Sequence, residues 1–496
     1  MGKIQDNIKN RGRNSMYDIS IIGAGVVGGA IARELSKYNI KVCLIEKEED
    51  VSEGASKANS GIIHGGYAAP YGTLKGQVCI EGNRMYSQLN EELNFGFRKT
   101  GAVVIGFDEE DEEKIKELYE NSLKMGYNNV EIIYEDKIKE LEPHINPDVR
   151  VALYDRDVGV ASPYELVVAL VENAIDNGTE LKLKTEVLAI EKEEDYFKIK
   201  TNQGNIDSKY IINAAGLYSD KVANMVGIND FHILPKKGQY VLFGKDQAYL
   251  VKTVVFQVPT SKGKGILVTT TYHGNFMIGP NAEETEDRRD IDTSLEGVEY
   301  VIETARKSIA DFNIKKALTT FSGVRATSST KDFIIEESNV PRFINVAGID
   351  SPGLTSAPAI AKKVVNILRD IGLKLEEKSN FNPYRESIFI KKDKDFDGKI
   401  DDENSEKNII CRCEQVTESE IIDALNRNIP INSINAIKKR TRVGMGLCQG
   451  IFCTPRVKEI ISREKNIPVE EITLRGDITK EEPERVAINV IKKIEK

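Results

Sequence analysis

Residues 17–28 read YDISIIGAGVVG, and this stretch decides the fold of the first part of the chain. Its first six residues are mostly apolar and rich in isoleucine, which is typical of a buried strand. The motif G-A-G-V-V-G at residues 23–28 follows, and helical composition with apolar spacing continues to Tyr38. A second short strand leads to Glu46. The pattern predicts a βαβ unit with a glycine-rich turn between its first strand and its helix.

Each glycine of this motif has a role that its small size explains. Gly23 permits a tight turn, Gly25 lets the backbone approach a pyrophosphate, and Gly28 allows the helix and the strand to pack closely. The N–H groups at the helix N-terminus stabilise phosphates. Glu46 stands 18 positions after the last glycine (46 − 28), where it can accept hydrogen bonds from ribose hydroxyls. The unit is therefore predicted to bind a dinucleotide.

The composition excludes several classes of protein. The 496 residues are 40% hydrophobic and 30% charged, which suits packed cores and is too apolar for a disordered chain. At about 150 residues per domain, the length suggests roughly three units. The net charge of −9 disfavours a nucleic-acid binder, and no apolar run is long enough to predict a membrane span. Residues 1–15 are polar, lack the apolar stretch of a secretory signal, and are predicted to form a disordered extension.

The rest of the chain alternates between helical and strand patterns. In chain order, we expect one or two surface helices over 108–142, strands at 186–200 and 210–213, an antiparallel sheet over 231–280, a strand at 343–347 and a helix over 357–370. Residues 373–407 are polar and charged and are the expected linker.

Four of the six cysteines lie in the C-terminal fifth of the chain, as Cys411, Cys413, Cys448 and Cys453. A long chain with so few cysteines is not a disulfide scaffold, so the paired clustering indicates a metal site and a reducing cytoplasm. Four thiolates could ligate zinc or a [2Fe–2S] cluster. The C-x-C spacing favours the cluster, because C-x₂₋₄-C pairs dominate in structural zinc sites.

Residues 393–404 follow the calcium-loop template at positions 1, 3, 5, 6, 8 and 9. The template requires a bidentate Glu at its last position, where this chain has Asn404. Without that carboxylate any calcium site would be weak, so we interpret the stretch as part of the charged linker.

Residues 53–67, EGASKANSGIIHGGY, resemble the flavin-contacting segment of the D-amino-acid-oxidase-like FAD enzymes. Three later stretches match that superfamily in the same order: 185–187 resembles the strand that meets the adenine, 213–220 the second glycine-containing FAD loop, and 348–358 the loop that closes over the flavin ring. The resemblance covers about residues 17–370 and implies FAD rather than NAD. The FAD-binding residues that it implies are Gly23, Gly25, Val27, Gly28, Glu46, Lys47, Ala55, Ser56, Asn59, Ser60, Gly61, Val187, Ala214, Ala215, Gly216, Gly348, Gly353, Leu354 and Thr355.

The resemblance also implies an α/β fold, with a Rossmann-like FAD-binding domain interleaved with an α+β substrate domain that carries an antiparallel sheet. We expect this FAD-dependent oxidoreductase domain over 16–372, with FAD-binding parts at about 16–90, 150–230 and 320–372 and substrate parts at about 91–149 and 231–319.

The two cysteine strings resemble the bacterioferritin-associated-ferredoxin-like [2Fe–2S] domain, in the form appended to several flavin dehydrogenases. This resemblance implies a small all-α domain over 408–460 with the four cysteines as cluster ligands. A helical tail is expected over 461–496.

Two residues are the candidates for the chemistry. His64 lies in the flavin-contacting segment and is one of 4 histidines in the chain, so it is a candidate base for an alcohol proton, with a flavin hydrogen bond as the alternative. Arg325 matches the superfamily's substrate-anion arginine, and its fork of donors suits a phosphate or a carboxylate. An ordinary ion pair is the alternative for Arg325. Tyr272, His273 and Lys262 are weaker candidates for lining the substrate site.

Two branches of the superfamily compete for the function. Residues 64–83 resemble L-2-hydroxyglutarate oxidases, whereas residues 348–356 and the iron–sulfur tail resemble the anaerobic glycerol-3-phosphate dehydrogenase large-subunit type. The cluster domain favours the second branch. Either resemblance implies that a secondary alcohol bearing an anionic group is oxidised to a ketone by FAD. A non-catalytic electron-transfer subunit is a third possibility.

The predicted cluster has a use in such an enzyme. It would accept electrons from the flavin one at a time and pass them on, which implies an electron-accepting protein partner and favours a dehydrogenase over an oxidase. With no predicted span, any membrane contact would be made through that partner.

Overall fold

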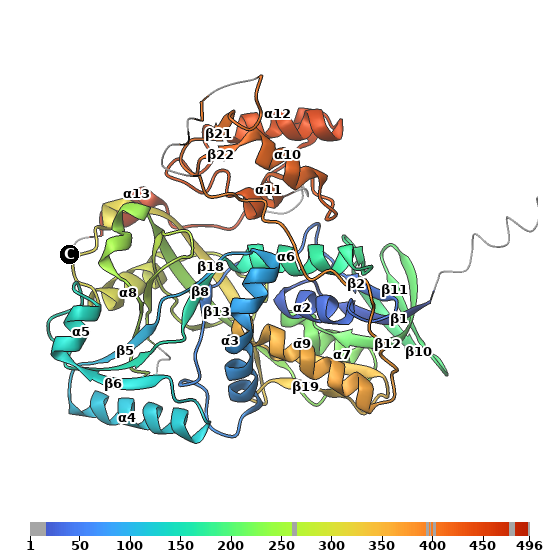
Figure 1. Cartoon of the computed structure of the whole chain (residues 1–496), viewed down its shortest axis with the longest axis horizontal. Coiled ribbons are helices and arrows are strands. Elements are labelled where there is room, and N and C mark those ends of the chain that lie inside the picture. The colour runs from blue at the N-terminus through green and yellow to red at the C-terminus, as the bar shows by residue number, and fades with distance from the viewer. Residues whose placement is uncertain are drawn as a thin grey trace, which may run out of the picture.

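The computed structural model describes residues 16–259, 265–392, 396, 398–399, 403–475 and 482–494. The expected extension at 1–15, the candidate Lys262 and most of the calcium-like stretch at 393–404 therefore lie outside the described residues. Figure 1 shows a sheet flanked by helices on the right, a second sheet on the left, and a small C-terminal unit above them.

The first sheet is built on the predicted βαβ unit. Strand β1 (Tyr17–Ile22) pairs in parallel with β2 (Val42–Ile45) and β12 (Gly204–Asn213), and α2 (Val26–Leu35) connects β1 to β2. Both faces of these central strands are covered, which explains their nearly continuous apolar sequences. The other strands of this sheet are β9 (Glu180–Lys182), β10 (Val187–Lys192), β11 (Phe197–Thr201), β19 (Ile334–Glu337) and β20 (Phe343–Ala347).

Helices cover this sheet from both sides. On one side α2 packs against α6 (Pro163–Asp176) and α9 (Gly353–Asp370), and α3 (Leu74–Leu93) packs against α9. Helix α7 (Ser219–Asn224) contacts β12 and β20. Helix α9 confirms the helix expected over 357–370 but begins four residues earlier, because the Gly and Pro residues of that segment are typical of a loop in sequence.

The second sheet has nine strands and includes the predicted antiparallel pairs. β13 (Ile233–Phe243) pairs antiparallel with β16 (Phe276–Ile278), which pairs antiparallel with β15 (Val268–Thr270). By contrast, β14 (Val254–Gln257) pairs in parallel with β5 (Ala102–Gly106). The remaining strands are β6 (Val130–Tyr134), β7 (Val151–Asp155), β17 (Glu283–Glu284) and β18 (Ala317–Ser328).

Two strands of the nine-stranded sheet fall within the residue ranges that we expected to form FAD-binding parts. We placed β7 and most of β18 in FAD-binding parts, at 150–230 and 320–372, but both lie in the nine-stranded sheet. β7 pairs with β5 and β6, and β18 pairs with β13 along its length. Apolar alternation is the same in either sheet, so the sequence does not reveal which partner a strand takes.

The helices expected over 108–142 are α4 (Glu109–Lys124) and α5 (Glu135–Leu141), with β6 between them. Helix α8 (Leu295–Arg306) packs on β13. The tail ends in the short helix α13 (Ile488–Ile491), which contacts β18 and buries Ile491 in the core of the second sheet. A small three-stranded sheet contains β3 (Ile62–Ile63), β4 (Phe97–Lys99) and β8 (Gly159–Ala161), and the 3₁₀ helices are η1 (Gly216–Tyr218), η2 (Lys245–Leu250), η3 (Ile314–Lys316) and η4 (Val469–Glu471).

The C-terminal unit is helical, as predicted, with one additional two-stranded ladder. Its helices are α10 (Glu418–Asn426), α11 (Ile434–Thr441) and α12 (Thr454–Lys465), and β21 (Ile409–Cys411) pairs with β22 (Val416–Thr417). Among the described helices, we find none with both the length and the apolar character needed to cross a membrane.

Buried ion pairs join this unit to the first sheet. Arg440 of α11 is completely buried and donates to both carboxylate oxygens of Asp50, at 2.8 Å each. Lys439 lies 2.7 Å from the same carboxylate and also pairs with Glu53. The unit is therefore anchored on the loop that leads into the flavin-contacting segment.

Candidate functional site

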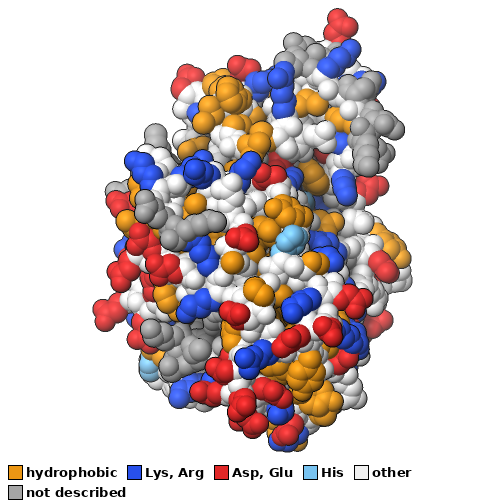
Figure 2. All heavy atoms as spheres, turned by 90° about the vertical axis from the view of Figure 1, so that its left-hand side faces the viewer, with side chains coloured by type: hydrophobic (Ala, Val, Ile, Leu, Met, Phe, Trp, Pro, Cys, Tyr) orange, Lys and Arg blue, Asp and Glu red, His pale blue; other side chains and the backbone are white. Residues whose placement is uncertain are grey.

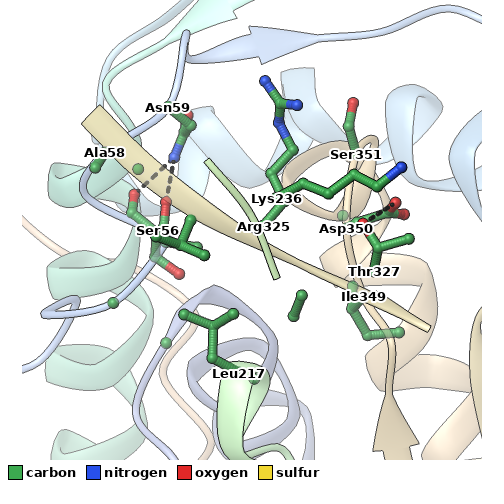
Figure 3. A pocket seen from close by; sticks show the side chains of 18 of the residues that line it. Ser56, Ala58, Asn59, Leu217, Lys236, Arg325, Thr327, Ile349, Asp350 and Ser351 are labelled. Atoms are coloured by element: carbon green, nitrogen blue, oxygen red, sulfur yellow. Dashed lines mark hydrogen bonds between the residues drawn. The ribbon is translucent and has the colours of Figure 1, made fainter. Parts of the chain in front are cut away.

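A cavity of about 2090 Å³ is lined by residues of both large sheets and of the loops between them (Figure 3). It collects most of the site residues that the sequence predicted. Those lining it are His64, Arg325, Gly23, Gly25, Val27, Glu46, Lys47, Ala55, Ser56, Asn59, Ser60, Val187, Ala214, Ala215, Gly216, Gly353 and Leu354.

Four predicted residues lie behind the cavity wall instead. A side chain on Gly28 would come within 1.8 Å of the Gly23 carbonyl oxygen, and one on Gly61 within 2.4 Å of the Ala161 carbonyl oxygen. Gly348 packs in the same way against Ser328, and the Thr355 hydroxyl accepts a hydrogen bond from His64 N at 2.9 Å. These residues permit close packing or orient a neighbour, so they support the site without lining it.

One end of the cavity fits the phosphate and ribose part of a dinucleotide. Gly23 has a φ of +106°, and a Cβ there would meet the Ala214 carbonyl oxygen at 2.5 Å, so the β1–α2 turn requires glycine. Gly25 has no side chain to cap α2, and the first turn of α2 carries no acidic residue; the neutral Ser56 hydroxyl accepts from Val26 N at 2.9 Å, so the positive end of the helix still favours an anion.

Glu46 is held at the end of β2 by two backbone donors. Its carboxylate accepts from Ala24 N at 2.8 Å and from Glu48 N at 3.0 Å. Burial raises the pKa of Glu46, in opposition to these hydrogen bonds. The carboxylate still has acceptor capacity for ribose hydroxyls, so this end of the cavity fits the cofactor that the motif implies.

The loop between Ser56 and Gly61 is braced by Asn59. Its amide nitrogen donates to the carbonyl oxygens of Ala55 and Ser56, at 3.0 and 2.9 Å, and its oxygen accepts from Gly61 N at 2.8 Å. Figure 3 shows the first two bonds at the edge of the cavity. Asn59 therefore shapes the flavin-contacting loop through its own backbone contacts.

His64 sits at the cavity wall directly after β3. Its backbone is fixed from two helices, by Thr355 of α9 and by Asn83 of α3, whose amide donates to the His64 carbonyl oxygen at 2.8 Å. Its ring centroid lies 5.7 Å from that of Phe256. Fixed backbone and ring packing give the imidazole a defined position beside the predicted flavin-contacting loop, as a proton acceptor requires.

A buried acid lies beneath this loop. A Cβ on Gly65 would fall 1.8 Å from Asp155 Oδ2, and Asp155 Oδ1 accepts from the Tyr127 hydroxyl at 2.6 Å. Asp155 is 1% exposed, and burial raises its pKa from 3.8 to about 6. Between pH 4 and pH 6, therefore, Asp155 is mostly protonated in the folded protein and mostly ionised in the unfolded chain.

We expect Asp155→Asn to stabilise the protein at pH 8 but not at pH 4. Because the pKa of Asp155 is higher in the folded state, wild-type stability falls as the pH rises from about 4 to about 6, by roughly 3 kcal/mol for this group. The amide keeps the Tyr127 contact without the charge. Urea denaturation at both pH values measures the difference.

The neighbouring Asp157 provides the control for this test. Despite burial, hydrogen bonds from Asn129 and Lys99 lower the pKa of Asp157. Asp157→Asn should therefore lose stability at pH 8. A stability gain from Asp155→Asn that is equal at both pH values would contradict the assignment.

Arg325 lies on β18 at the other side of the cavity. Its Nη2 donates to the Asn281 carbonyl oxygen at 3.2 Å. A Cβ on Gly238 of β13 would stand 2.6 Å from the same nitrogen, so glycine there leaves room for the guanidinium. Two residues earlier on β18, Gly323 packs against Ala58 of the flavin-contacting segment. The Tyr240 side chain also hydrogen-bonds to Arg325, so the guanidinium is held close to that segment with some of its donors still available.

The structure corrects the weaker expectations. Tyr272 and His273 do not line the cavity; His273 Nε2 lies 2.7 Å from Glu165 Oε1, and Tyr272 packs against Gly96. Sequence reasoning missed Lys236 and Tyr240, which line the cavity from β13. Their spacing on a strand that faces β18 is the available signal, but it requires knowledge of the strand pairing.

The four C-terminal cysteines come together in the helical unit as two pairs. The Cys453 thiol hydrogen-bonds to Cys411 and lowers its pKa to about 6, with help from backbone N–H groups of Gly444, Glu414 and Cys413. Burial opposes ionisation of Cys448, but N–H groups of Phe452 and Gly450 lower the pKa of this thiol.

Glycines make room beside these thiols. A Cβ on Gly446 would lie only 2.1 Å from Cys413 Cβ. Position 446 must therefore be glycine for the loop before Cys448 to pass Cys413. The thiols lie as the pairs Cys411–Cys453 and Cys413–Cys448. Two thiol pairs with N–H donors fit a two-iron cluster, because each iron needs two protein ligands.

We expect Cys448→Ser to lose iron and sulfide while FAD stays bound. The thiolate is a ligand in our assignment, whereas the lining of the main cavity does not include it. Iron analysis and the visible spectrum of protein prepared without oxygen measure both outcomes. Cys43→Ser, at a buried cysteine of β2, is the control and should keep its iron. Stoichiometric zinc in the wild type would refute the cluster assignment.

Two protein-family models match this chain, one over each of the two sites. The model of the family described as FAD dependent oxidoreductase matches residues 18–367, and that of the BFD-like [2Fe-2S] binding domain matches residues 409–463. Each match includes the motifs on which the two sites depend.

Individual relatives agree with this division. A glycerol 3-phosphate dehydrogenase of Caloramator mitchellensis is 46% identical over 471 residues, covering 92% of this chain and 96% of the relative. An L-2-hydroxyglutarate dehydrogenase of Indibacter alkaliphilus is 34% identical and covers 54% of this chain and 68% of its own length. The solved structure of dithionite-reduced L-alpha-glycerophosphate oxidase from Mycoplasma pneumoniae with FAD bound is 30% identical, with a TM-score of 0.72 over 75% of this chain and 98% of the oxidase.

Proposed function

The chain belongs to the FAD-dependent oxidoreductase family and carries a BFD-like [2Fe-2S] binding domain, and from that premise we propose that it oxidises sn-glycerol 3-phosphate to dihydroxyacetone phosphate. The observation that carries the proposal is a cavity in which a base candidate and an anion-binding arginine both lie beside the flavin-contacting loop. The similarity of nearly the whole chain to a glycerol 3-phosphate dehydrogenase supports the same substrate.

The proposed reaction removes a hydride and a proton from the C2 alcohol. Bound FAD supplies the hydride acceptor, and the [2Fe–2S] cluster carries electrons onward one at a time. We assign the hydroxyl proton to the imidazole of His64. Arg325 would bind the phosphate through its guanidinium fork and so hold the C2 carbon over the flavin-contacting segment.

The contacts between the two domains support electron transfer toward the cluster. The Tyr164 hydroxyl lies 3.5 Å from Met445 Sδ and accepts from Arg442 at 2.9 Å. Met445 belongs to the cysteine loop, while Pro163, next to Tyr164, packs against Gly61. A packed route therefore runs from the flavin-contacting loop to the cluster loop.

Anaerobic mixing with candidate substrates tests the function. We expect sn-glycerol 3-phosphate to bleach the flavin absorbance, and glycerol to leave it almost unchanged because Arg325 would have no anion to bind. If L-2-hydroxyglutarate reduces the flavin faster than sn-glycerol 3-phosphate does, the enzyme is an L-2-hydroxyglutarate dehydrogenase instead. Reduction by none of these compounds would favour the non-catalytic electron-transfer subunit.

The electron acceptor is proposed to be a protein that docks over the cluster loop, and any membrane contact would be made through it. Leu447, Ile451 and Phe452 are 73, 75 and 80% exposed, and they stand directly beside Cys448 and Cys453. On the face seen in Figure 2, hydrophobic side chains gather on the upper part of the molecule, where Figure 1 places the C-terminal helices. Exposed apolar groups beside a redox centre suit a transient protein contact.

We expect the double variant Leu447→Ser, Phe452→Ser to slow electron transfer to a protein but not to a small oxidant. Reduction of soluble ferredoxin should fall roughly tenfold, since these apolar anchors would be lost, while reduction of ferricyanide stays unchanged. Substrate-driven turnover with each acceptor measures both rates. Equal rates for wild type and variant with ferredoxin would contradict docking at this surface.

A further inference from the structure

We propose that Lys236 is a second cation of the substrate site and that, with Arg325, it selects a phosphate dianion. This inference rests on the proposed function and adds to it the charge state of the group that is recognised. Lys236 and Arg325 are directly opposite one another in the antiparallel pairing of β13 with β18, and both line the cavity.

Directly opposite residues of antiparallel strands leave the sheet on the same face, with Cβ atoms about 4.5–5.5 Å apart. Figure 3 shows Lys236 and Arg325 starting beside one another at the cavity, with the lysine side chain running toward Asp350 and Ser351 and the arginine side chain running in another direction. The guanidinium is fixed by its hydrogen bond to the Asn281 carbonyl oxygen and lies close against Gly238. The lysine side chain, by contrast, has a flexible four-carbon stem. The lysine can therefore adjust to an anion that the arginine positions.

The two cations lack an acidic partner within the described part of the chain. Neither has a carboxylate within salt-bridge distance, although like charges at opposite positions of a sheet are destabilising. The next residue, Lys237, lies on the other face and pairs with Asp290 at 2.8 Å and with Glu283 at 3.8 Å. A bound anion would relieve the repulsion between Lys236 and Arg325.

Glu284 of β17 is directly opposite Lys236 on the side away from β18, but no ion pair joins the two among the described residues; the other nearby acids are engaged elsewhere. Asp350, from the loop after β20, pairs with Lys75 of α3 at 2.5 Å and accepts from Thr327 at 3.1 Å. Glu283, from β17, accepts from Gln239 at 2.8 Å as well as facing Lys237. The positive charge at Lys236 and Arg325 is therefore not neutralised by a direct ion pair among the described residues, which leaves it available to a ligand.

The position of the pair suits a substrate that reaches the flavin-contacting loop. Gly323 touches Ala58 of that loop, and Arg325 is two residues further along β18, which is roughly 7 Å of extended strand. A phosphate monoester carries both of its charges on one group, with a second pKa near 6. Two adjacent cations match that group better than they match a single carboxylate.

The test compares Lys236→Met with Lys221→Met, a control at an exposed lysine of α7 that lines the same cavity. We expect Lys236→Met to raise the Kd for sn-glycerol 3-phosphate roughly tenfold or more, with little change in the limiting rate of flavin reduction. Lys236→Arg should restore most of the affinity, and Lys221→Met should match the wild type. Stopped-flow flavin reduction gives Kd and limiting rate separately.

A pH profile separates recognition of charge from a structural effect. Wild-type affinity should rise between pH 5.5 and 7.5 as the phosphate loses its second proton, and Lys236→Met should flatten that rise. An unchanged Kd, an equal loss in Lys221→Met, failure of Lys236→Arg to rescue, or an unaltered pH profile would each overturn the inference. If sn-glycerol 3-phosphate fails to reduce the wild-type flavin, the proposed function fails instead.

Discussion

Arg325→Ala should weaken binding of sn-glycerol 3-phosphate by roughly 30-fold or more while FAD remains bound. A charge-assisted pair in a partly dry site is worth roughly 2–5 kcal/mol by truncation. Arg325 lines the cavity from β18 and bonds to the Asn281 carbonyl oxygen and to the Tyr240 side chain, so other donors of its five N–H groups remain for the phosphate. The dependence of flavin reduction on substrate concentration gives the Kd, and the flavin spectrum reports FAD content.

Two variants control this experiment. Arg325→Lys keeps the charge but lacks the planar fork, so it should rescue binding only in part. Arg289→Ala removes an exposed arginine from the rim of the same cavity and should change little. If Arg325→Ala shows wild-type kinetics, Arg325 does not bind the substrate. The main physical reason for expecting an anionic substrate would then be lost.

The sequence predicted the cofactor end of the site well, because short-range geometry controls it. The β1–α2 turn needs glycine at Gly23 for its conformation and at Gly28 for packing, whatever the rest of the chain does. The spacing of Glu46 follows from one βαβ unit, and Cys411 with Cys413 and Cys448 with Cys453 form two short cysteine motifs that can be seen in the sequence. Constraints of this kind leave a local pattern that can be seen without knowledge of the fold.

The substrate end was harder to predict, because it depends on which strands pair. Lys236 is 89 residues from Arg325 in sequence (325 − 236), and only the register of β13 with β18 makes them neighbours. Tyr272 and His273 lie in the turn between β15 and β16 and do not line the cavity. A one-residue change of register turns a strand's side chains to the opposite face, so composition alone cannot assign them.

The charged run at residues 438–442, KKRTR, is a second case where sequence pattern misleads. Runs of this kind are usually solvated, but Lys439, Arg440 and Arg442 are all buried. Arg442 Nε lies 2.9 Å from Glu414, and Arg440 contacts Asp50, which is 390 residues away. Asp50 lies in the other domain, so the burial of Arg440 emerges only when the two domains are seen together.

That interface gives the prediction with the largest effect on stability. Arg440→Met should destabilise the docked state by roughly 3–5 kcal/mol, because it leaves the buried carboxylate of Asp50 with Lys439 as its remaining cation. The loop that carries Asp50 leads into the flavin-contacting segment, so we also expect slower electron transfer to the cluster. Urea denaturation measures the stability, and the time courses of flavin and cluster absorbance after substrate addition measure the transfer.

A double variant distinguishes loss of the pair from loss of packing. Arg440→Met combined with Asp50→Asn removes both partners, so it should be less destabilised than the sum of the single variants. Lys114→Met breaks the exposed Lys114–Glu110 pair of α4 and should change the stability very little. If the double variant is as unstable as the sum, the buried charges are independent of one another. The anchoring of the cluster domain would then rest on the apolar contacts of α11 with α6, and its distance from the flavin-contacting loop would no longer depend on Asp50.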